Sequence, residues 1–176
     1  MTHDYFEFLG LPPNLAIDLK DLEKRFLDLS RRYHPDLNAR KPVAEREQAL
    51  EASAILNDAY RTLREPIARA MYLLRREGFD IGEQTTKDVP PELLEEVFEL
   101  NMALEELKEG DTDALPQIAA ARERFTGTRK EVDSEIEAKF GEWDATRNRE
   151  TLAAIRGLLN RRKYISNLID KTNVPD

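Results

Sequence analysis

Cysteine is absent from the 176-residue sequence, and histidine occurs only twice. Without a thiol the chain forms no disulfide, supplies no cysteine ligand to an iron–sulfur cluster and has no thiol nucleophile. Two histidines alone do not provide the four ligands that a structural zinc site takes from cysteine and histidine. We therefore expect a protein that holds no metal and no cofactor of its own.

Glycine and long apolar runs are also scarce. Only 7 glycines occur, and no stretch alternates apolar and polar residues over a useful length, which argues against a turn-rich all-β fold. No apolar run approaches the roughly 20 residues that span a bilayer. The first residues, Met1 to Tyr5, contain neither the basic nor the apolar region of a secretory signal. These absences predict an all-α protein in the cytoplasm, without membrane contact.

Charge is distributed unevenly along the chain. Residues 1–78 contain 13 acidic and 13 basic side chains, so the whole net charge of −8 falls in residues 79–176. Two halves of different charge suggest two domains with different partners. An acidic chain also argues against general nucleic-acid binding, which requires a net basic surface that displaces counterions.

The first half contains an amphipathic helix with clear limits. Asp18 is a suitable N-cap, and Pro35 disfavours helical geometry at the residue before it. Between these limits one apolar stripe recurs every three or four residues. Its members are Leu19, Leu22, Phe26, Leu29 and Tyr33.

A helical hairpin is predicted once the next segments of the chain are added. Residues 36–42 are expected to form a loop, and a second helix extends from about Val43 to Leu63. The two helices would pack antiparallel with the His-Pro-Asp sequence at the tip of the hairpin. A shorter helix begins at Pro66 and ends at Gly78. The expected first domain therefore covers residues 1–78.

The second half is predicted to be a three-helix bundle, residues 90–176, after a linker at 79–89 that lacks helical periodicity. The expected helices run from about Pro90 to Lys108, Ala114 to Phe140 and Arg147 to Asp170, with a connection at Gly141–Thr146. The single tryptophan, Trp143, falls in that connection. We expect its side chain to cap the end of the bundle.

The first helix of this bundle has more apolar residues than one core-facing stripe requires. Its seam repeats at intervals of four and three residues, through Leu93, Val97, Leu100, Leu104 and Leu107. A second apolar line, formed by Leu94, Phe98 and Met102, is rotated from the seam by roughly 100–180°. Apolar residues left exposed in a line usually mark an interaction site. Packing of this line against the first domain, or weak self-association through it, are the alternatives.

Tyr33-His34-Pro35-Asp36, at the end of an amphipathic helix, resembles the signature of J-domains. The helix before it and the segment Leu56–Leu63 after it are similar to the two hairpin helices of that domain. Three further segments narrow the resemblance to the HscB family, the J-type co-chaperones of iron–sulfur cluster biogenesis; they are Tyr5-Phe6, Leu9–Pro12 and Thr62–Pro66. The second half resembles the family more loosely, through Leu94, Phe98–Asn101, Trp143 and Lys163-Tyr164.

The resemblance implies a non-enzymatic co-chaperone that stimulates the ATPase of an HscA-type chaperone, a relative of DnaK. It also implies delivery of an IscU-type iron–sulfur scaffold to that chaperone. The His-Pro-Asp loop and the basic flank of the preceding helix would bind the chaperone, since a cationic strip suits an acidic patch on an ATPase domain. The residues concerned are Lys24, Arg25, Arg31, Arg32, Tyr33, His34, Pro35 and Asp36.

Scaffold binding is expected on the second apolar line and its acidic border. The family's scaffold-binding positions are matched by Leu94, Phe98, Glu99 and Glu106, and an aromatic one on the last helix by Tyr164. Two positions depart from the pattern, because Glu95 replaces an apolar residue and Met102 replaces an acidic one. The resemblance thus implies a patch shifted toward Met102, or a client surface that has changed with it.

Catalysis by the chain itself is not expected. His34 has the chemistry of a general base, but the sequence ties no nucleophile, carboxylate or orienting group to it. The chain also lacks a glycine-rich phosphate loop with which to hydrolyse ATP. A general J-protein for unfolded clients would need Gly/Phe-rich linkers, which are absent. A self-associating module is the second alternative, which sedimentation at several concentrations would separate from a client-binding protein.

Overall fold

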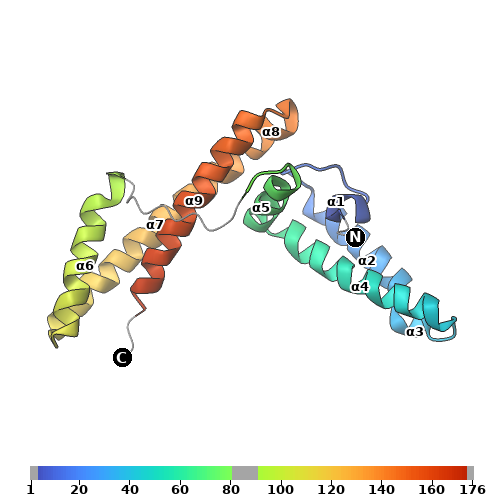
Figure 1. Ribbon diagram of the computed structural model, residues 1–176, viewed down its shortest axis with the longest axis horizontal. Coiled ribbons are helices and arrows are strands. Elements are labelled where there is room, and N and C mark those ends of the chain that lie inside the picture. The colour runs from blue at the N-terminus through green and yellow to red at the C-terminus, as the bar shows by residue number, and fades with distance from the viewer. Residues whose placement is uncertain (1–3, 81–90, 174–176) are drawn as a thin grey trace. The chain divides into compact units, whose positions relative to one another are not determined.

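The computed structural model describes residues 4–80 and 91–173, and its regular structure over these ranges is entirely helical (Figure 1). The predicted all-α fold is therefore confirmed. Contacts divide the chain into two compact units, one of Met1–Asp80 with Phe140–Thr151 and one of Ile81–Lys139 with Leu152–Asp176. The linker predicted at 79–89 lies outside the described residues from position 81 onward.

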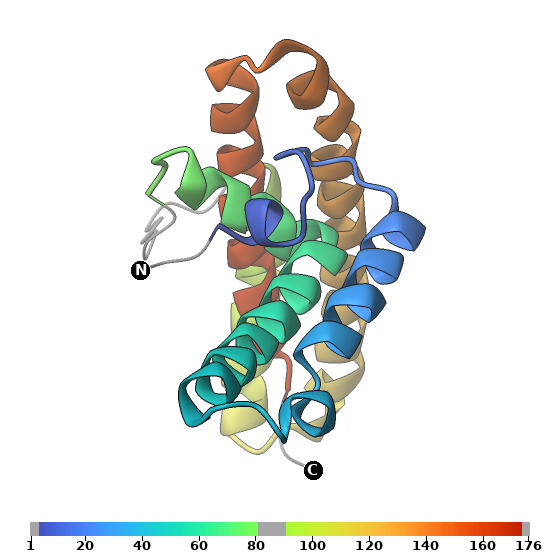
Figure 2. The ribbon, with the colours of Figure 1, turned by 90° about the vertical axis from the view of Figure 1, so that its right-hand side faces the viewer.

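The first unit is built around the predicted hairpin. Its helices are α1 (Tyr5–Phe8), α2 (Leu19–Tyr33), α3 (Pro35–Asn38), α4 (Val43–Arg64), α5 (Pro66–Arg76) and α8 (Phe140–Thr146). Figure 2 shows α2 and α4 side by side, with α3 in the connection at one end. The rings of Phe26 and Tyr60 stack between them at a centroid distance of 4.2 Å. Leu22, Leu56 and Leu63 are fully buried beside this pair, so the hairpin is confirmed.

The limits of α2 follow from local chemistry. Asp18 caps the helix by accepting hydrogen bonds from the backbone N–H groups of Lys20, at 2.8 Å, and Asp21, at 3.4 Å. At the other end His34 has extended backbone angles (φ −59°, ψ 132°), as the following proline favours.

The loop predicted at 36–42 is wrong over its first part. Residues Pro35–Asn38 form the single turn α3, and His34 is its N-cap. The proline that ends α2 is also well suited to start a helix, because its fixed φ is helical and its missing N–H would have no partner in a first turn. The same residue therefore acts as both stop and start signal.

The connection predicted at Gly141–Thr146 is also wrong, since this segment belongs to the helix α8. Trp143, expected to cap the bundle, is instead buried in the first unit, where the guanidinium of Arg147 lies 5.3 Å from its ring centroid. The segment joins the N-terminal domain through contacts with residues more than 120 positions earlier in the chain. The spacing of apolar residues within the segment does not indicate which distant part of the chain it packs against.

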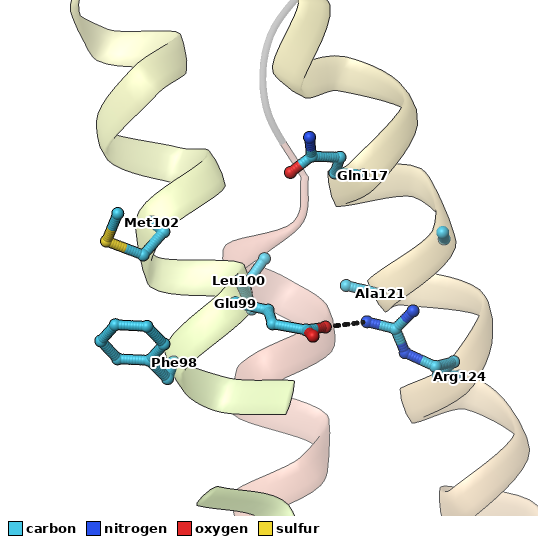
Figure 3. A pocket seen from close by; sticks show the side chains of 8 residues that line it. Phe98, Glu99, Leu100, Met102, Gln117, Ala121 and Arg124 are labelled. Carbon is cyan, nitrogen blue, oxygen red and sulfur yellow. Dashed lines mark hydrogen bonds and ion pairs between the residues drawn. The ribbon is translucent and has the colours of Figure 1, made fainter. Parts of the chain in front are cut away.

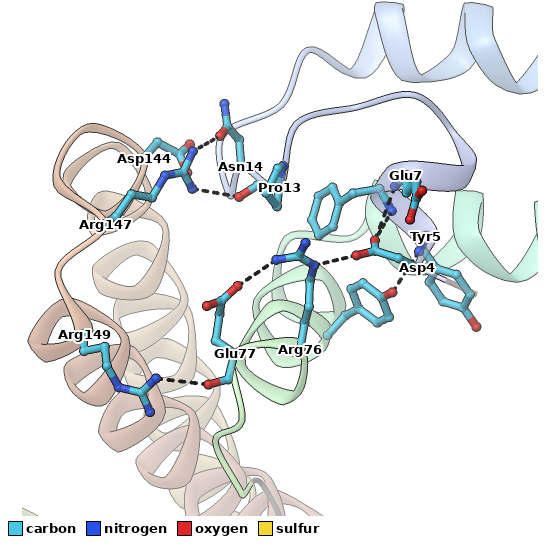
Figure 4. A network of polar contacts seen from close by, with 12 residues as sticks. Asp4, Tyr5, Glu7, Pro13, Asn14, Arg76, Glu77, Asp144, Arg147 and Arg149 are labelled. Atoms are coloured by element: carbon cyan, nitrogen blue, oxygen red, sulfur yellow. Dashed lines mark hydrogen bonds and ion pairs between the residues drawn. The ribbon is translucent and has the colours of Figure 1, made fainter. Parts of the chain in front are cut away.

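Polar contacts hold α8 against the loop between α1 and α2 (Figure 4). The Asp144 carboxylate accepts hydrogen bonds from the backbone N–H groups of Leu15 and Ala16, each at 2.8 Å. Arg147 donates to the carbonyl of Pro13 at 2.8 Å and to the side chain of Asn14. Residues 13–16 are thus held at four successive positions by one turn of chain from the second half of the sequence.

The second unit contains α6 (Leu94–Lys108), α7 (Leu115–Ala138) and most of α9 (Arg149–Lys171), with short 3-10 turns at Pro91–Leu93 and Thr112–Ala114. The three-helix bundle is confirmed. α6 ends in a Schellman motif, in which Gly110 takes a φ of +96° that favours glycine. An ion pair between Asp133 and Arg162 joins α7 to α9. The bundle core takes Leu93, Val97 and Leu100 from the predicted seam, whereas Leu104 and Leu107 are half-buried and Ala103 is buried.

No helix within residues 4–80 and 91–173 is both long and apolar enough to cross a membrane.

A charged cluster fastens the start of the chain to the end of α5 (Figure 4). Asp4 accepts a 2.6 Å hydrogen bond from Arg76 Nε and a 2.9 Å bond from the N–H of Phe6. Partial burial by itself would raise the pKa of the Asp4 carboxyl, but the bond from Arg76 and the backbone N–H of Glu7 outweigh it and hold the pKa below its usual 3.8. The ionised form of Asp4 is therefore stabilised by folding.

Asp4→Asn is expected to lower the urea midpoint of unfolding near neutral pH but to have no effect in strong acid. Asparagine still caps a helix, so the change removes the charge alone. Because the folded-state pKa of Asp4 lies below that of the unfolded chain, its contribution is present above pH 3.8 and is lost as the pH falls through the folded value. Unfolding of both proteins over a pH series measures this. In an Arg76→Gln background the effect should shrink, and an equal effect in both backgrounds would contradict the assignment.

Candidate functional site

The turn from α2 to α3 presents His34 and Asp36 to solvent. The backbone N–H of Asp36 donates a 3.2 Å hydrogen bond to His34 Nδ1, so Nδ1 is an acceptor and the imidazole proton lies on Nε2. The side chains of His34 and Asp36 are 52% and 89% exposed. The imidazole is thus oriented by the turn that it caps, while its Nε2–H and the Asp36 carboxylate remain open to a partner.

Asn38 supports this turn from beneath and was missed by sequence reasoning. Its side chain is buried, and Nδ2 donates to the carbonyl of Arg32 at 3.1 Å and to that of His34 at 2.8 Å. The carbonyl of Arg32 lies in the last turn of α2, where helix carbonyls lack intrahelical partners, whereas the carbonyl of His34 also accepts a 3.2 Å bond from the backbone N–H of Asn38. An asparagine two residues after the His-Pro-Asp sequence was a usable signal, since asparagine favours such side-chain to backbone bonds.

Asn38→Ala is expected to reduce the predicted stimulation of a chaperone's ATPase several-fold while leaving the helical content unchanged. The change leaves the carbonyl of Arg32 without its side-chain donor, which costs about 1–3 kcal/mol locally, and it removes one of the two donors to the carbonyl of His34. The turn then samples other conformations, and His34 is held less well. Stimulation at saturating protein should be lower than for the unmodified chain. Unchanged stimulation would show that Asn38 does not position the turn.

The predicted chaperone-binding residues on α2 fall into two groups. Arg31 is exposed, and so are Lys24 and Arg32. Arg25 is instead engaged inside the unit, because its guanidinium donates to Asp21 at 2.8 Å and to the carbonyl of Gly10 at 2.7 Å. Through the bond to Gly10, Arg25 therefore stabilises the turn that follows α1.

Tyr33 is half-buried rather than open. Its ring lies 6.1 Å from that of Phe8 in α1, and the Arg32 guanidinium lies 5.9 Å from its centroid. Tyr33 thus anchors the end of α2 and presents Arg32 beside the His-Pro-Asp turn.

The side chains of His34 and Asp36 are exposed and do not form a hydrogen bond with each other. Asp36 Oδ2 lies 3.8 Å from His34 Nδ1, beyond hydrogen-bond distance, and the turn is exposed to water. Among the residues that the structure describes, no group of three or more histidine and acidic side chains is placed to hold a metal ion. The chemistry available at this surface is recognition through one N–H, one carboxylate and adjacent cations.

A second open surface lies on α6. Leu94, Phe98 and Met102 are 54%, 66% and 49% exposed, although each is a large apolar side chain. The predicted second apolar line therefore does not form part of the bundle core. Glu95 is exposed beside it, and Glu106 is half-buried further along the helix.

The remaining predicted scaffold residues are placed differently. Glu99 does not stand free, since Arg124 Nη2 on α7 donates to its Oε2 at 3.1 Å. Tyr164 is half-buried on α9, and burial raises the pKa of its phenol.

A groove of about 410 Å³ runs between α6 and α7 (Figure 3). Phe98, Glu99 and Met102 line it from α6, together with the buried Leu100. The α7 side consists of Gln117, Ala120, Ala121 and Arg124. Sequence reasoning missed the α7 side, because periodicity defines a face of a helix but not which neighbouring helix that face meets.

Both halves of the chain match family models. The model of the DnaJ domain matches residues 4–72, and the one described as the HSCB C-terminal oligomerisation domain matches residues 89–173. A co-chaperone protein HscB homolog from Vibrio vulnificus (strain YJ016) is 38% identical over 140 residues, which cover 79% of this chain and 81% of that protein. This chain belongs to the HscB family of co-chaperones. The resemblance predicted from the sequence is confirmed.

Other HscB proteins extend the similarity over nearly the whole chain. The iron-sulfur cluster co-chaperone protein HscB of Mus musculus is 30% identical over 170 residues, 97% of this chain and 68% of that protein. The crystal structure of human co-chaperone protein HscB matches with a TM-score of 0.70 and 27% identity, covering 97% of this chain and 81% of that one. Chaperone HscB from Vibrio cholerae matches with a TM-score of 0.56 and 25% identity, covering 97% and 99%.

Membership of the HscB family settles the class of activity. HscB homologues are co-chaperones and not enzymes, and a J-domain protein regulates the ATPase of its partner. This chain is therefore a J-domain co-chaperone whose partner is a DnaK-type chaperone. ATP is hydrolysed in the partner and not in this chain.

Proposed function

We propose that this protein stimulates the ATPase of an HscA-type chaperone and delivers an IscU-type iron–sulfur scaffold to it, in the cytoplasm. The observation that carries the proposal is the open His34 and Asp36 turn, in a chain that also leaves the apolar line on α6 uncovered. A J-domain alone would account for the first surface. The second requires another partner, and the name of the mouse relative, an iron-sulfur cluster co-chaperone, supports a scaffold in that role.

The chaperone-binding surface consists of the His-Pro-Asp turn and the exposed cations of α2. Lys24, Arg31 and Arg32 speed the encounter with an acidic surface and orient it, more than they add affinity. The Nε2–H of His34 and the carboxylate of Asp36 then favour the hydrolysis-competent conformation of the partner. We assign Arg25 and Tyr33 a supporting role, since both are engaged within the unit.

The scaffold-binding surface consists of Leu94, Phe98 and Met102, bordered by the acidic Glu95, Glu99 and Glu106 of α6. Burying these apolar side chains supplies affinity, about 25 cal/mol for each Å² removed from water. The acidic border restricts the choice of partner. Tyr164 on α9 is assigned to the same surface.

The functional division follows the two halves of the sequence. We assign chaperone stimulation to residues 1–78 and client binding to residues 90–176, with 79–89 as linker. α8 belongs to the second of these segments but is packed in the first compact unit. Two contacts on one molecule raise the effective concentration of the client at the chaperone.

Steady-state ATP hydrolysis by the HscA-type chaperone tests the proposal. The rate is measured with this protein, with the IscU-type scaffold and with both together. We expect synergy, so that the rate with both exceeds the sum of the separate stimulations. A lack of stimulation in every combination would contradict the proposal and leave the hairpin as a structural element.

Self-association is the second candidate role for the α6 surface. The uncovered apolar line and the match to a model described as an oligomerisation domain favour it. Sedimentation at several concentrations distinguishes the two roles. A concentration-dependent dimer that dissociates on adding scaffold would mean that both use the same surface.

A further inference from the structure

The groove between α6 and α7 continues the exposed apolar line onto a second helix. Phe98 and Met102 form its α6 side, and Ala120 is exposed on the α7 side, while the buried Leu100 and Ala121 form its floor. Two successive alanines on α7 keep the space open, because a larger side chain at either position would occupy it. The groove therefore exists because α7 contributes small side chains to it while α6 contributes large ones.

Charge at the groove is balanced inside and negative outside. Glu99 and Arg124 pair with each other at 3.1 Å, so the interior carries no net charge (Figure 3). The rest of α6 is acidic, with Glu95, Glu96, Glu105 and Glu106 against the single Lys108. A segment that fits both properties has an apolar side chain for the groove and basic residues on either side of it.

We infer that this groove receives an apolar side chain, flanked by basic residues, from the scaffold protein, so that α7 is part of the client-binding site. The inference rests on the proposed function and extends it to residues of α7. The small side chain of Ala120 leaves space on the α7 side of the groove, and Gln117 offers an amide that donates to and accepts from a peptide backbone. Arg124 forms one wall with its aliphatic stem while its charge stays on Glu99.

The ion pair between Glu99 and Arg124 orients these two side chains but does not close the groove. Both side chains are about half exposed, and exposed ion pairs contribute little to stability. A partner's lysine or arginine can therefore share the Glu99 carboxylate with Arg124 at little cost. This arrangement predicts that raising the salt concentration weakens scaffold binding, because the flanking cations are screened.

Ala120→Trp tests the inference, with Ala119→Trp as its matched control. Both alanines are exposed on α7, but only Ala120 lines the groove. Filling the groove should weaken scaffold affinity, measured by calorimetry, by about tenfold or more, as expected for a blocked interface centre. Ala119→Trp should leave the affinity within about twofold, as a change outside the buried contact does. Chaperone stimulation without scaffold should be normal in both variants, which confirms intact folding.

Site-specific cross-linking provides a second readout. Since the chain contains no cysteine, Ala120→Cys and Ala119→Cys each create a unique thiol for a photoreactive maleimide. Ala120→Cys should cross-link to the scaffold, and Ala119→Cys should do so far less. Equal yields from both positions would overturn the placement of the scaffold in the groove.

Phe98→Ala, measured alongside, separates failure of this inference from failure of the proposed function. Weaker binding with Phe98→Ala but not with Ala120→Trp would overturn the groove and keep the scaffold on α6 alone. Normal affinity in both variants would remove the scaffold site altogether. If Ala120→Trp changed only the sedimentation of the protein, the occupant would be a second copy of the chain, and the inference would also be wrong.

Discussion

His34→Gln is expected to abolish stimulation of the partner chaperone while leaving the thermal midpoint of unfolding within a few degrees. The imidazole caps the single turn α3, and loss of such a cap costs about 0.5–2 kcal/mol. The packing of α2 on α4 does not involve it, because its side chain is half exposed. What the change removes is an N–H held at a defined position, which a flexible glutamine does not reproduce.

The measurement is the chaperone's steady-state ATPase rate over a range of co-chaperone concentrations. The variant should remain at the basal rate even at saturation, whereas a variant with weaker docking alone would reach the normal maximum at higher concentration. His3→Gln, which changes the only other histidine, is the control and should stimulate normally. Stimulation retained by His34→Gln would refute the role of the turn.

Leu94→Ala combined with Phe98→Ala is expected to weaken scaffold binding by about 2 kcal/mol or more, which is about thirtyfold in Kd. Both side chains are more than half exposed in the free protein, so their truncation leaves the bundle core intact. Their apolar surface leaves water only when the partner binds. The loss should therefore appear in affinity and not in stability.

Calorimetric titration of the scaffold gives the affinity, and circular dichroism gives the unfolding midpoint. Leu115→Ala is the matched control, because Leu115 is an exposed leucine at the start of α7 that does not line the groove. ATPase stimulation in the absence of scaffold should be normal in the double variant. Unchanged affinity would exclude this face of α6 as the binding site and favour self-association.

Structural features that depend on only a few neighbouring residues, such as the limits of helices, were predicted correctly from the sequence. Asp18 and Pro35 set the limits of α2, because capping and the steric demand of proline involve only adjacent backbone. The end of α5 just before Gly78 follows for a similar reason, since this glycine takes a positive φ. The exposed line on α6 was also visible, since one helix has only one core-facing side.

The loop predicted after Pro35 was wrong, and the contacts of Arg25 within the unit were not predicted, because each of these residue types has more than one structural role. Pro35 both ends α2 and starts α3, and only the first was expected. Arg25 is basic and lies on α2 as predicted, but its guanidinium donates to Asp21 and to the carbonyl of Gly10, and its side chain is only partly exposed. A basic side chain on a helix carries no indication of which neighbour will accept its hydrogen bonds.

The sequence by itself determined the helical class, the J-domain motif and the apolar line on α6, because each depends on residue type and on spacing within one helix. Tertiary structure alone decided that α8 joins the N-terminal unit, through Asp144 and the backbone of Leu15. It also decided that Asn38 is buried under the His-Pro-Asp turn and that Ala120 of α7 and Phe98 of α6 line one groove. These contacts join residues that are distant in the chain or lie on different helices, and local periodicity is the same whichever partner is chosen.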